Sequence, residues 1–394
     1  MTINIAVPKE TLAGETRVAV VPDLVGKLGE KNGWSFFVQA GAGVASGYSD
    51  ADYEAAGATI VPDAASVYAK AGVTFHVQVP SLEQIAQLPE GSALISLLWP
   101  MQNPERVKAL AERKITAFAM DKVPRITRAQ AMDALSAMSS VSGYKAVLVA
   151  STELPKFCPM LMTAAGTIRP SRALILGAGV AGLMAIGTAR RLGCIVEAFD
   201  VRPAVKEQVE SLGAKFVEFS VDDAEDSGGY AKALDEDQQE RQLELIHKHI
   251  KDADMVITTA LIPGRKAPVL VTDAMLQDMR PGSVVVDLAA SQGGNCEGAQ
   301  ADKTVVVHDV KVIGPTNLPA TVSFHASQMF AKVITNLLAE LSNEEGLQVD
   351  LENEVTVGCL ITYAGDVNHA RTREAMDLPP LAKAEASETA APSA

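Results

Sequence analysis

Residues 173–200, ALILGAGVAGLMAIGTARRLGCIVEAFD, have the composition and spacing needed to hold the pyrophosphate of a dinucleotide. Gly177 permits a tight turn after an apolar strand, Gly179 lets the backbone approach a phosphate, and Gly182 lets a helix pack closely on a sheet. The start of that helix offers N–H groups to phosphate oxygens. Asp200 closes the next strand, where an acid would accept hydrogen bonds from the adenine ribose. The pattern predicts a dinucleotide site in a βαβ unit.

Asp200 also bears on which dinucleotide is bound. Its carboxylate would repel the 2′-phosphate of NADP(H), so the sequence favours NAD(H). Arg202 could weaken this repulsion. A salt bridge at the end of a strand is the role that we expect for Arg202.

The other residues with reactive side chains form no recognisable site. The four cysteines, Cys158, Cys194, Cys296 and Cys359, are scattered without a CxxC pair, which is typical of reduced thiols in a cytosol-like compartment. His247 and His249 are two residues apart on an expected helix, so their side chains point in different directions and should not share a metal ion.

The composition is that of a globular enzyme with more than one domain. The chain has 394 residues, 48% of them hydrophobic and 21% charged. Its net charge of −14 and the lack of a basic cluster argue against nucleic acid as a partner. The N-terminus shows no export signal. The uncharged stretch between Arg172 and Arg190 is short and rich in glycine, so we expect no transmembrane helix.

The N-terminal half of the chain alternates strands and helices, which predicts a largely parallel sheet covered on both faces. Expected strands are residues 3–8, 35–40, 58–61, 73–78 and 93–99, and expected helices are 22–30, 52–56 and 63–71. The C-terminal half continues this alternation after Gly177, with strands at KFVEF, MVITTA, SVVVDL and VKVIG.

Two longer helices should connect these halves. Arg128–Ala150 and Ser327–Leu341 carry apolar residues at helical spacing. We expect the second helix to return the chain to the first domain, which makes that domain discontinuous. The expected fold is α/β with two Rossmann-like doubly wound domains, residues 1–136 plus 326–378 and residues 137–325.

Two segments lack an apolar period. Residues 379–394 are rich in alanine, proline and glutamate and are expected to form a flexible tail. Residues 221–241 are strongly polar and lie inside the second domain, where a solvated loop is the simplest expectation.

Several segments resemble a known family. ETRVAVVP (15–22) and FDVRPAVKEQVESLGAKF (199–216) are similar to signature regions shared by alanine dehydrogenases and the NAD(H)-binding component, domain I, of proton-translocating nicotinamide nucleotide transhydrogenases. The similarity runs from residue 3 to residue 370. It identifies the superfamily and leaves the branch to be decided by particular residues.

The residues that alanine chemistry needs are mostly absent. Arg17 agrees with the alanine dehydrogenase pattern, but His76 stands where that pattern has a substrate-binding lysine. Trp99 lies near the position of the catalytic histidine, and Ser291 replaces an aspartate before QGG. Reduction of an imino acid needs a proton donor and a group that holds the carboxylate, so these departures argue against this branch.

The segment 124–140, PRITRAQAMDALSAMSS, resembles the transhydrogenase loop that meets the nicotinamide ring. The resemblance implies that Arg125, Asp133 and Ser136 hold the carboxamide and ribose of NAD(H), and that Gln130 lies where the second nucleotide approaches. Without it, charges at a helix end and a surface pair would explain the charged side chains. SGGYAKAL (227–234) is similar to the mobile loop of domain I, in which Tyr230 closes over the nucleotide with Gly228 and Gly229 as hinge.

The implied NAD(H) contacts combine the glycine loop with the segments of this resemblance. They are Gly177, Ala178, Gly179, Val180, Gly182, Asp200, Val201, Arg202, Gly229, Tyr230, Gln242 and Leu261. Direct hydride transfer between two nicotinamides needs no protein acid or base, only two rings held together away from water. The chain has one dinucleotide pattern, so NADP(H) should sit on a partner.

The resemblance also implies an assembly. We expect a homodimer that docks on an NADP(H)-binding domain III subunit and a membrane-spanning proton-channel subunit, on the cytoplasmic face of the membrane and without inserting into it. Two alternatives stay open: an NAD-dependent amino-acid dehydrogenase of the alanine type, and a non-catalytic NAD(H)-binding module.

Overall fold

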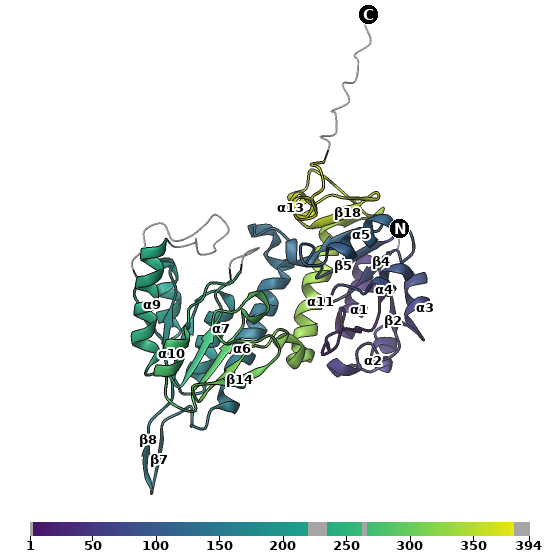
Figure 1. Ribbon diagram of the computed structural model, residues 1–394. Coiled ribbons are helices and arrows are strands. Elements are labelled where there is room, and N and C mark those ends of the chain that lie inside the picture. The colour runs from purple at the N-terminus through teal and green to yellow at the C-terminus, as the bar shows by residue number, and fades with distance from the viewer. Residues whose placement is uncertain (1–2, 220–234, 262–265, 382–394) are drawn as a thin grey trace, which may run out of the picture. The chain divides into compact units, whose positions relative to one another are not determined.

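The computed structural model describes residues 3–219, 235–261 and 266–381. The chain divides into two compact units, each with its own large sheet (Figure 1). The first unit consists of the chain through Leu12, Arg17–Ala134 and the chain from Ser327 onward. The second consists of Ala13–Thr16 and Leu135–Ala326.

The sheet of the first unit has the order β19-β18-β6-β5-β4-β1-β2-β3. The strands from β3 to β6 are parallel, and β18 and β19 add an antiparallel edge. Its strands are β1 (Asn4–Val7), β2 (Ser35–Gln39), β3 (Thr59–Val61), β4 (Val73–Phe75), β5 (Ala93–Ser96), β6 (Thr116–Ala119), β18 (Leu360–Tyr363) and β19 (Asp366–Val367). Its helices are α1 (Pro22–Asn32), α2 (Asp50–Ala55), α3 (Ala64–Ala69), α4 (Leu82–Gln87), α5 (Pro104–Glu112), α12 (Glu354–Cys359) and α13 (Ala370–Ala375).

Local sequence explains where these helices begin and end. Pro22 occupies the first turn of α1, where its missing N–H costs nothing, and Gly33 ends the helix in the left-handed region at φ 66°. Ser49 and Ser81 each form a capping box, with Asp52 and Gln84 three residues on.

The sheet of the second unit has the order β11-β10-β9-β12-β13-β15-β14, parallel except for β14. Its strands are β9 (Arg172–Leu176), β10 (Ile195–Phe199), β11 (Lys215–Val217), β12 (Met255–Thr258), β13 (Val284–Asp287), β14 (Thr304–Val307) and β15 (Val310–Ile313). Its helices are α6 (Ala134–Glu153), which starts at the boundary of the unit, α7 (Val180–Arg191), α8 (Lys206–Ser211), α9 (Glu236–Ile250) and α10 (Asp273–Asp278). A hairpin of β7 (Leu161–Thr163) and β8 (Gly166–Ile168) projects from it (Figure 1).

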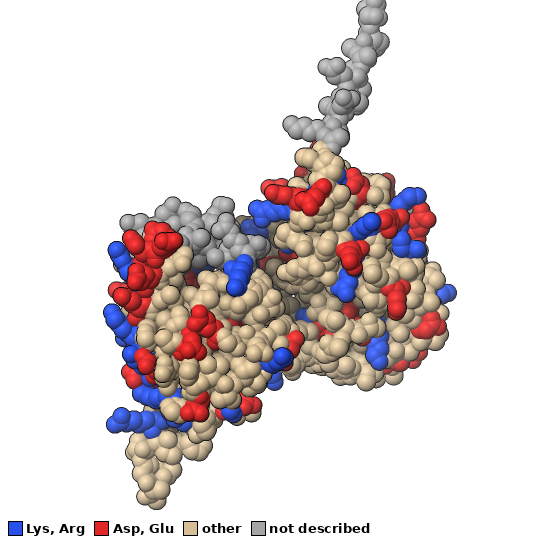
Figure 2. Space-filling view, viewed as in Figure 1, with Lys and Arg blue, Asp and Glu red and all other residues tan. Residues whose placement is uncertain are grey.

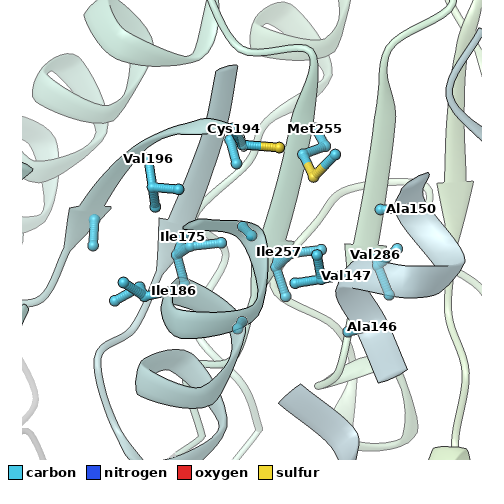
Figure 3. Packing of buried hydrophobic residues seen from close by; sticks show 14 of the residues in the cluster. Ala146, Val147, Ala150, Ile175, Ile186, Cys194, Val196, Met255, Ile257 and Val286 are labelled. Carbon is cyan, nitrogen blue, oxygen red and sulfur yellow. The ribbon is translucent and has the colours of Figure 1, made fainter. Parts of the chain in front are cut away.

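Alternating strand residues divide the core of the second unit between the two faces of its sheet. Ile175 and Ile257 belong to the cluster that includes residues of α6 and α7, such as Val147 and Ile186 (Figure 3). Their neighbours Leu174 and Val256 belong to the cluster on the opposite face, with residues of α9 and α10. Strands that are buried on both faces read as nearly continuous apolar runs, which is why MVIT and VVVD stand out in the sequence.

The connecting helices differ from the expectation mainly at their starts. Arg128–Ala150 is not one helix: residues Thr127–Met132 form a 3-10 turn, and α6 starts only after Asp133, whose ψ of 90° is not helical. A short polar side chain competes for nearby backbone groups and favours such a break. The second connecting helix, α11, runs over Ser323–Glu340, and the chain from Ser327 belongs to the first unit.

Candidate nucleotide-binding site

Two glycines of the GAGVAG segment are required by the packing of the protein itself. Gly177 follows β9 with φ 103°, and a methyl carbon built on it would lie 2.4 Å from Oγ1 of Thr259. A methyl carbon on Gly182, in the first turn of α7, would lie 1.8 Å from the carbonyl oxygen of Gly177. Neither distance is possible, so larger residues at these positions would push α7 away from the sheet.

Gly179 is different, because no atom of the described residues outside its own stretch of chain lies within 4 Å of the position that its Cβ would take. It precedes α7, which has no side-chain cap, and its neighbour Val180 is exposed. A helix N-terminus with uncapped N–H groups above an open glycine fits an anionic group. The packing of the described residues would therefore allow a larger residue at this position. A pyrophosphate resting on the backbone would instead require glycine, because a side chain would take its place.

Asp200 is buried at the end of β10 and joined to this glycine loop. Its Oδ2 accepts a hydrogen bond from the N–H of Ala178 at 2.7 Å, and its Oδ1 accepts the N–H of Arg202 at 2.9 Å. The guanidinium of Arg202 donates to both carboxylate oxygens, at 2.9 Å each. This confirms the expected salt bridge of Arg202, and the hydrogen bond from Ala178 shows that Asp200 also orients the glycine loop.

The strand order places these residues at the edge where α/β folds bind ligands. β9 and β12 are neighbours, and the connections leave them in opposite directions, toward β10 on one side and β13 on the other. Ligands of such sheets bind outside the carboxyl ends of the strands at this reversal. Gly177 follows β9 and Thr259 follows β12, and Oγ1 of Thr259 donates to the carbonyl of Gly177 at 3.2 Å.

The remaining expected cofactor contacts lie in different surroundings. Val201 and Gln242 are buried, next to Asp200 and in α9 respectively, and Leu261 is exposed just after β12. Gly229 and Tyr230, with the rest of SGGYAKAL, lie outside the described residues, as does most of the polar segment up to residue 234.

The residues expected to meet the nicotinamide ring are divided between the two units. Arg125 and Gln130 are exposed in the first unit, on either side of the start of the 3-10 turn, and Asp133 at its end is half-buried. Ser136 belongs to α6 in the second unit. Their joint role at a ring remains a proposal.

Sequence reasoning missed a buried network at the carboxyl ends of β12 and β13. Asp287, at the end of β13, accepts a hydrogen bond from Oγ1 of Thr258 at 2.9 Å and from the N–H of Asn295 at 2.7 Å. Burial and the carboxylate of Asp287 raise the pKa of the neighbouring Cys296 thiol, so this cysteine stays protonated. The only signal in the sequence is that polar residues flank a fully apolar strand.

His76 is buried in the first unit. Its Nδ1 lies 3.2 Å from a carboxylate oxygen of Glu10, its Nε2 lies 3.0 Å from the hydroxyl of Tyr68, and 1% of the residue is exposed. The strand expected over residues 73–78 ends at Phe75, because the same Glu10 oxygen takes the N–H of Val77 at 2.6 Å. A side chain with both ring nitrogens occupied is poorly placed to bind a substrate.

Trp99 has an unusual backbone conformation for a bulky residue, with φ 46°. Its N–H is held by Oδ1 of Asp121 at 3.1 Å. Trp99 carries no group that can donate a proton to a substrate carbon or nitrogen in the way a histidine can. Ser291, the third departure from the alanine pattern, lies in a 3-10 turn over Ala290–Gln292.

The described residues contain neither a metal-binding cluster nor a membrane-spanning helix. No group of three or more His, Cys, Asp or Glu side chains among them is arranged to hold a metal ion. Over the same residues, no helix combines the length and apolar character that crossing a bilayer requires.

Comparison with known proteins gives matches over most of the chain. Residues 6–142 match the alanine dehydrogenase/PNT N-terminal domain and residues 146–370 the alanine dehydrogenase/PNT C-terminal domain. The chain is 46% identical to the first of the proteins that make up the NAD(P) transhydrogenase alpha subunit of Rhodospirillum rubrum, covering 93% of this chain and 98% of that protein. It is 29% identical to alanine dehydrogenase of Halomonas elongata, covering 95% and 97%. The crystal structure of transhydrogenase from Sinorhizobium meliloti superimposes with a TM-score of 0.84 at 43% identity, covering 92% and 99%.

Proposed function

The chain belongs to the alanine dehydrogenase/PNT family, and we propose that it is the NAD(H)-binding subunit of a proton-translocating NAD(P) transhydrogenase. Its proposed reaction is direct hydride transfer between NADH on this chain and NADP⁺ on a partner subunit. Transhydrogenase alpha subunits are its relatives at 41% to 46% identity, whereas the alanine dehydrogenases are 28% or 29% identical.

The burial of His76 is the observation that favours this branch over an amino-acid dehydrogenase. An enzyme that reduces an imino acid must hold a carboxylate and deliver a proton. His76 faces Glu10 and Tyr68 instead, and burial raises the pKa of the Tyr68 hydroxyl, so neither group is free to donate to a substrate. Transfer between two nicotinamides needs neither group.

The residues of this chain then act by binding and orientation. Bound NADH supplies the hydride. The open backbone at Gly179 and the start of α7 would hold its pyrophosphate, and Asp200 would receive its adenine ribose. Arg125, Asp133 and Ser136 would fix the carboxamide and ribose at the reactive end, with Gln130 toward the incoming nucleotide. Tyr230 and Gly229 would cover the bound coenzyme.

Partners are the second element of the proposal. NADP(H) would sit on a domain III subunit, and a membrane-spanning subunit would couple the reaction to proton movement, with this chain at the cytoplasmic face. What supports partners is that the relatives are named as subunits, or portions of subunits, of a larger enzyme.

We also propose a homodimer built around the projecting hairpin of β7 and β8. Met160, Met162 and Ile168 are exposed on it, Met162 to 78%. Figure 2 shows the hairpin without any blue or red side chain, below the charged surface of the second unit. A long uncharged arm exposed to water favours burial against a second copy, where a two-fold axis would bury both arms at once.

A reconstitution distinguishes the candidate functions. The isolated chain should neither reduce NADP⁺ with NADH nor deaminate alanine with NAD⁺, and hydride transfer should start when an NADP(H)-binding domain III protein is added. NAD⁺-dependent deamination of alanine by the chain alone would establish the dehydrogenase instead. A non-catalytic module would bind NADH with unchanged affinity after replacement of Arg125, Gln130 and Asp133, and would transfer no hydride under any of these conditions.

A further inference from the structure

The side chain of Asn295 holds the backbone just after β12. Its Nδ2 donates to the carbonyl oxygens of Ala260 at 2.8 Å and Pro268 at 2.7 Å, and its Oδ1 accepts the N–H of Ala260 at 3.0 Å. Asn295 is fully buried. The hydrogen bonds of this side-chain amide therefore go to main-chain groups of Ala260 and Pro268, which lie before and after the segment that starts with Leu261.

Asp287 holds Asn295 in turn. Its Oδ2 accepts the N–H groups of Asn295 at 2.7 Å and Cys296 at 3.0 Å, and its Oδ1 accepts Thr258 Oγ1 at 2.9 Å and the N–H of Ala289 at 2.8 Å. Asp287 is also fully buried. A buried carboxylate with four donors is a rigid support, because loss of any donor would leave one of its acceptor positions without a hydrogen bond in the interior.

This support reaches the glycine loop through consecutive residues of one strand end. Thr258 contacts Asp287, Thr259 contacts the carbonyl of Gly177, and Ala260 contacts Asn295. The position of Ala260 is therefore set on one side by the network and on the other by the loop that we assign to the pyrophosphate. Leu261 follows directly and is 36% exposed at the carboxyl end of the strands.

We propose that Asn295 is a positioning residue for the coenzyme: it holds the backbone at Ala260 so that the Leu261 side chain packs against bound NAD(H). This inference rests on the proposed function. An apolar side chain at the crevice edge improves binding only if its backbone is fixed before the ligand arrives, because ordering it during binding would cost free energy. Asparagine suits the task, since one amide group can pair with an N–H and with two carbonyls.

The test is a double-mutant cycle on NADH binding by the full chain, followed by equilibrium fluorescence titration. Asn295→Ser removes the reach to both carbonyls without adding charge. We expect its NADH dissociation constant to rise about tenfold, and Leu261→Ala to give a rise of similar size. The double variant should bind about as weakly as either single variant, because both changes remove the same contact.

A matched control separates positioning from general weakening. Asp254 is a buried aspartate at the opposite, amino end of β12, where it accepts the N–H of Arg172 at 2.8 Å and contacts Lys156 Nζ at 2.6 Å. Asp254→Asn should lower the unfolding temperature and leave NADH affinity within about twofold of wild type, since its network lies away from the crevice. If Asn295→Ser does not fold, Asn295→Ala, which likewise removes the hydrogen bonds to both carbonyls and adds no charge, takes its place.

The outcomes are distinct. Wild-type affinity in the Asn295 variants, or losses that add fully with Leu261→Ala, would overturn the positioning role while leaving the proposed function in place. If Asp254→Asn weakened NADH binding as much as Asn295→Ser, destabilisation alone would explain the loss and the role would again be overturned. Failure of the wild-type chain to bind NADH would contradict the proposed function itself.

Discussion

Gly143, in the middle of α6, lies directly against Ala181 in the first turn of α7. A methyl carbon built on Gly143 would be 2.0 Å from the carbonyl oxygen of Ala181 and 2.8 Å from its carbonyl carbon. The atoms on the other side are main chain and cannot move out of the way without moving α7. The helix that carries the proposed phosphate-binding N–H groups is thus positioned by α6 from behind.

Gly143→Ala should therefore damage both stability and binding. We expect the free energy of unfolding to fall by about 1–3 kcal/mol or more, as for an overpacked core, and NADH affinity to fall with it because α7 is displaced. Gly187→Ala in α7 is the control: its Cβ would have 3.4 Å to Arg191, and it should gain up to about 1 kcal/mol from helix propensity. Chemical denaturation of both variants with NADH titration checks this, and equal behaviour of the two would refute the close contact.

Gly179→Ala should show the opposite pattern. Since no neighbouring atom of residues 3–219, 235–261 and 266–381 lies within 4 Å of the added methyl group and Gly179 has a φ of −75°, the fold should tolerate it, with a change in unfolding free energy of about 0.5 kcal/mol or less. The methyl group would, however, stand where we place the pyrophosphate. A loss of NADH affinity without loss of stability, measured by calorimetric titration and thermal unfolding, is the expected result. Unchanged affinity would mean that the coenzyme lies elsewhere.

Asp200→Ala should change which coenzyme is accepted. Removing the carboxylate would take away the hydrogen bonds that we propose it makes to the ribose and its repulsion of a 2′-phosphate, and it would remove the partner of the Arg202 guanidinium. NADH should bind about tenfold or more weakly while NADPH binds better than to wild type, which competitive titration would measure. Arg202→Ala, which leaves the acid in place, should not favour NADPH. An unaltered NADH-to-NADPH affinity ratio in Asp200→Ala would argue against the ribose role.

Met162→Lys should break the proposed homodimer. The side chain is among the most exposed apolar groups of the hairpin, so a charge there costs little in a monomer and much in a buried interface. Sedimentation velocity should show dimers for wild type and monomers for the variant, with unchanged thermal stability at low concentration. Val306→Lys, on the exposed edge strand β14, is the matched control and should remain dimeric. Monomeric wild-type protein would remove any role of the hairpin in assembly.

Features with a local cause could be predicted from the sequence. Gly177 and Gly182 have roles fixed by the strand, turn and helix around them, and the apolar runs of β12 and β13 are visible because both faces of these strands are buried. The break at Asp133 could not be predicted from the spacing of apolar residues, because a 3-10 turn still places apolar residues such as Ala129 and Met132 toward the interior.

Features that join distant segments could not be predicted. The contact of Gly143 with Ala181 and the hydrogen bonds between Asn295 and Ala260 depend on packing between segments that are far apart in the chain. A glycine or an asparagine in the sequence does not by itself indicate which residue it will contact. The same holds for β18, which pairs with β6 from the other end of the sequence. Short strands such as β14, at an edge and half exposed, lack the buried run that marks the central strands.

The proposed function requires above all that this chain binds one coenzyme and leaves the other to a partner. Equilibrium titration of the isolated chain with NADH and with NADPH, at the same ionic strength and protein concentration, tests this directly. We predict one NADH site per chain and, for NADPH, only weak binding that NADH displaces. A second, independent site that holds NADPH while NADH is bound would contradict the proposed division between subunits.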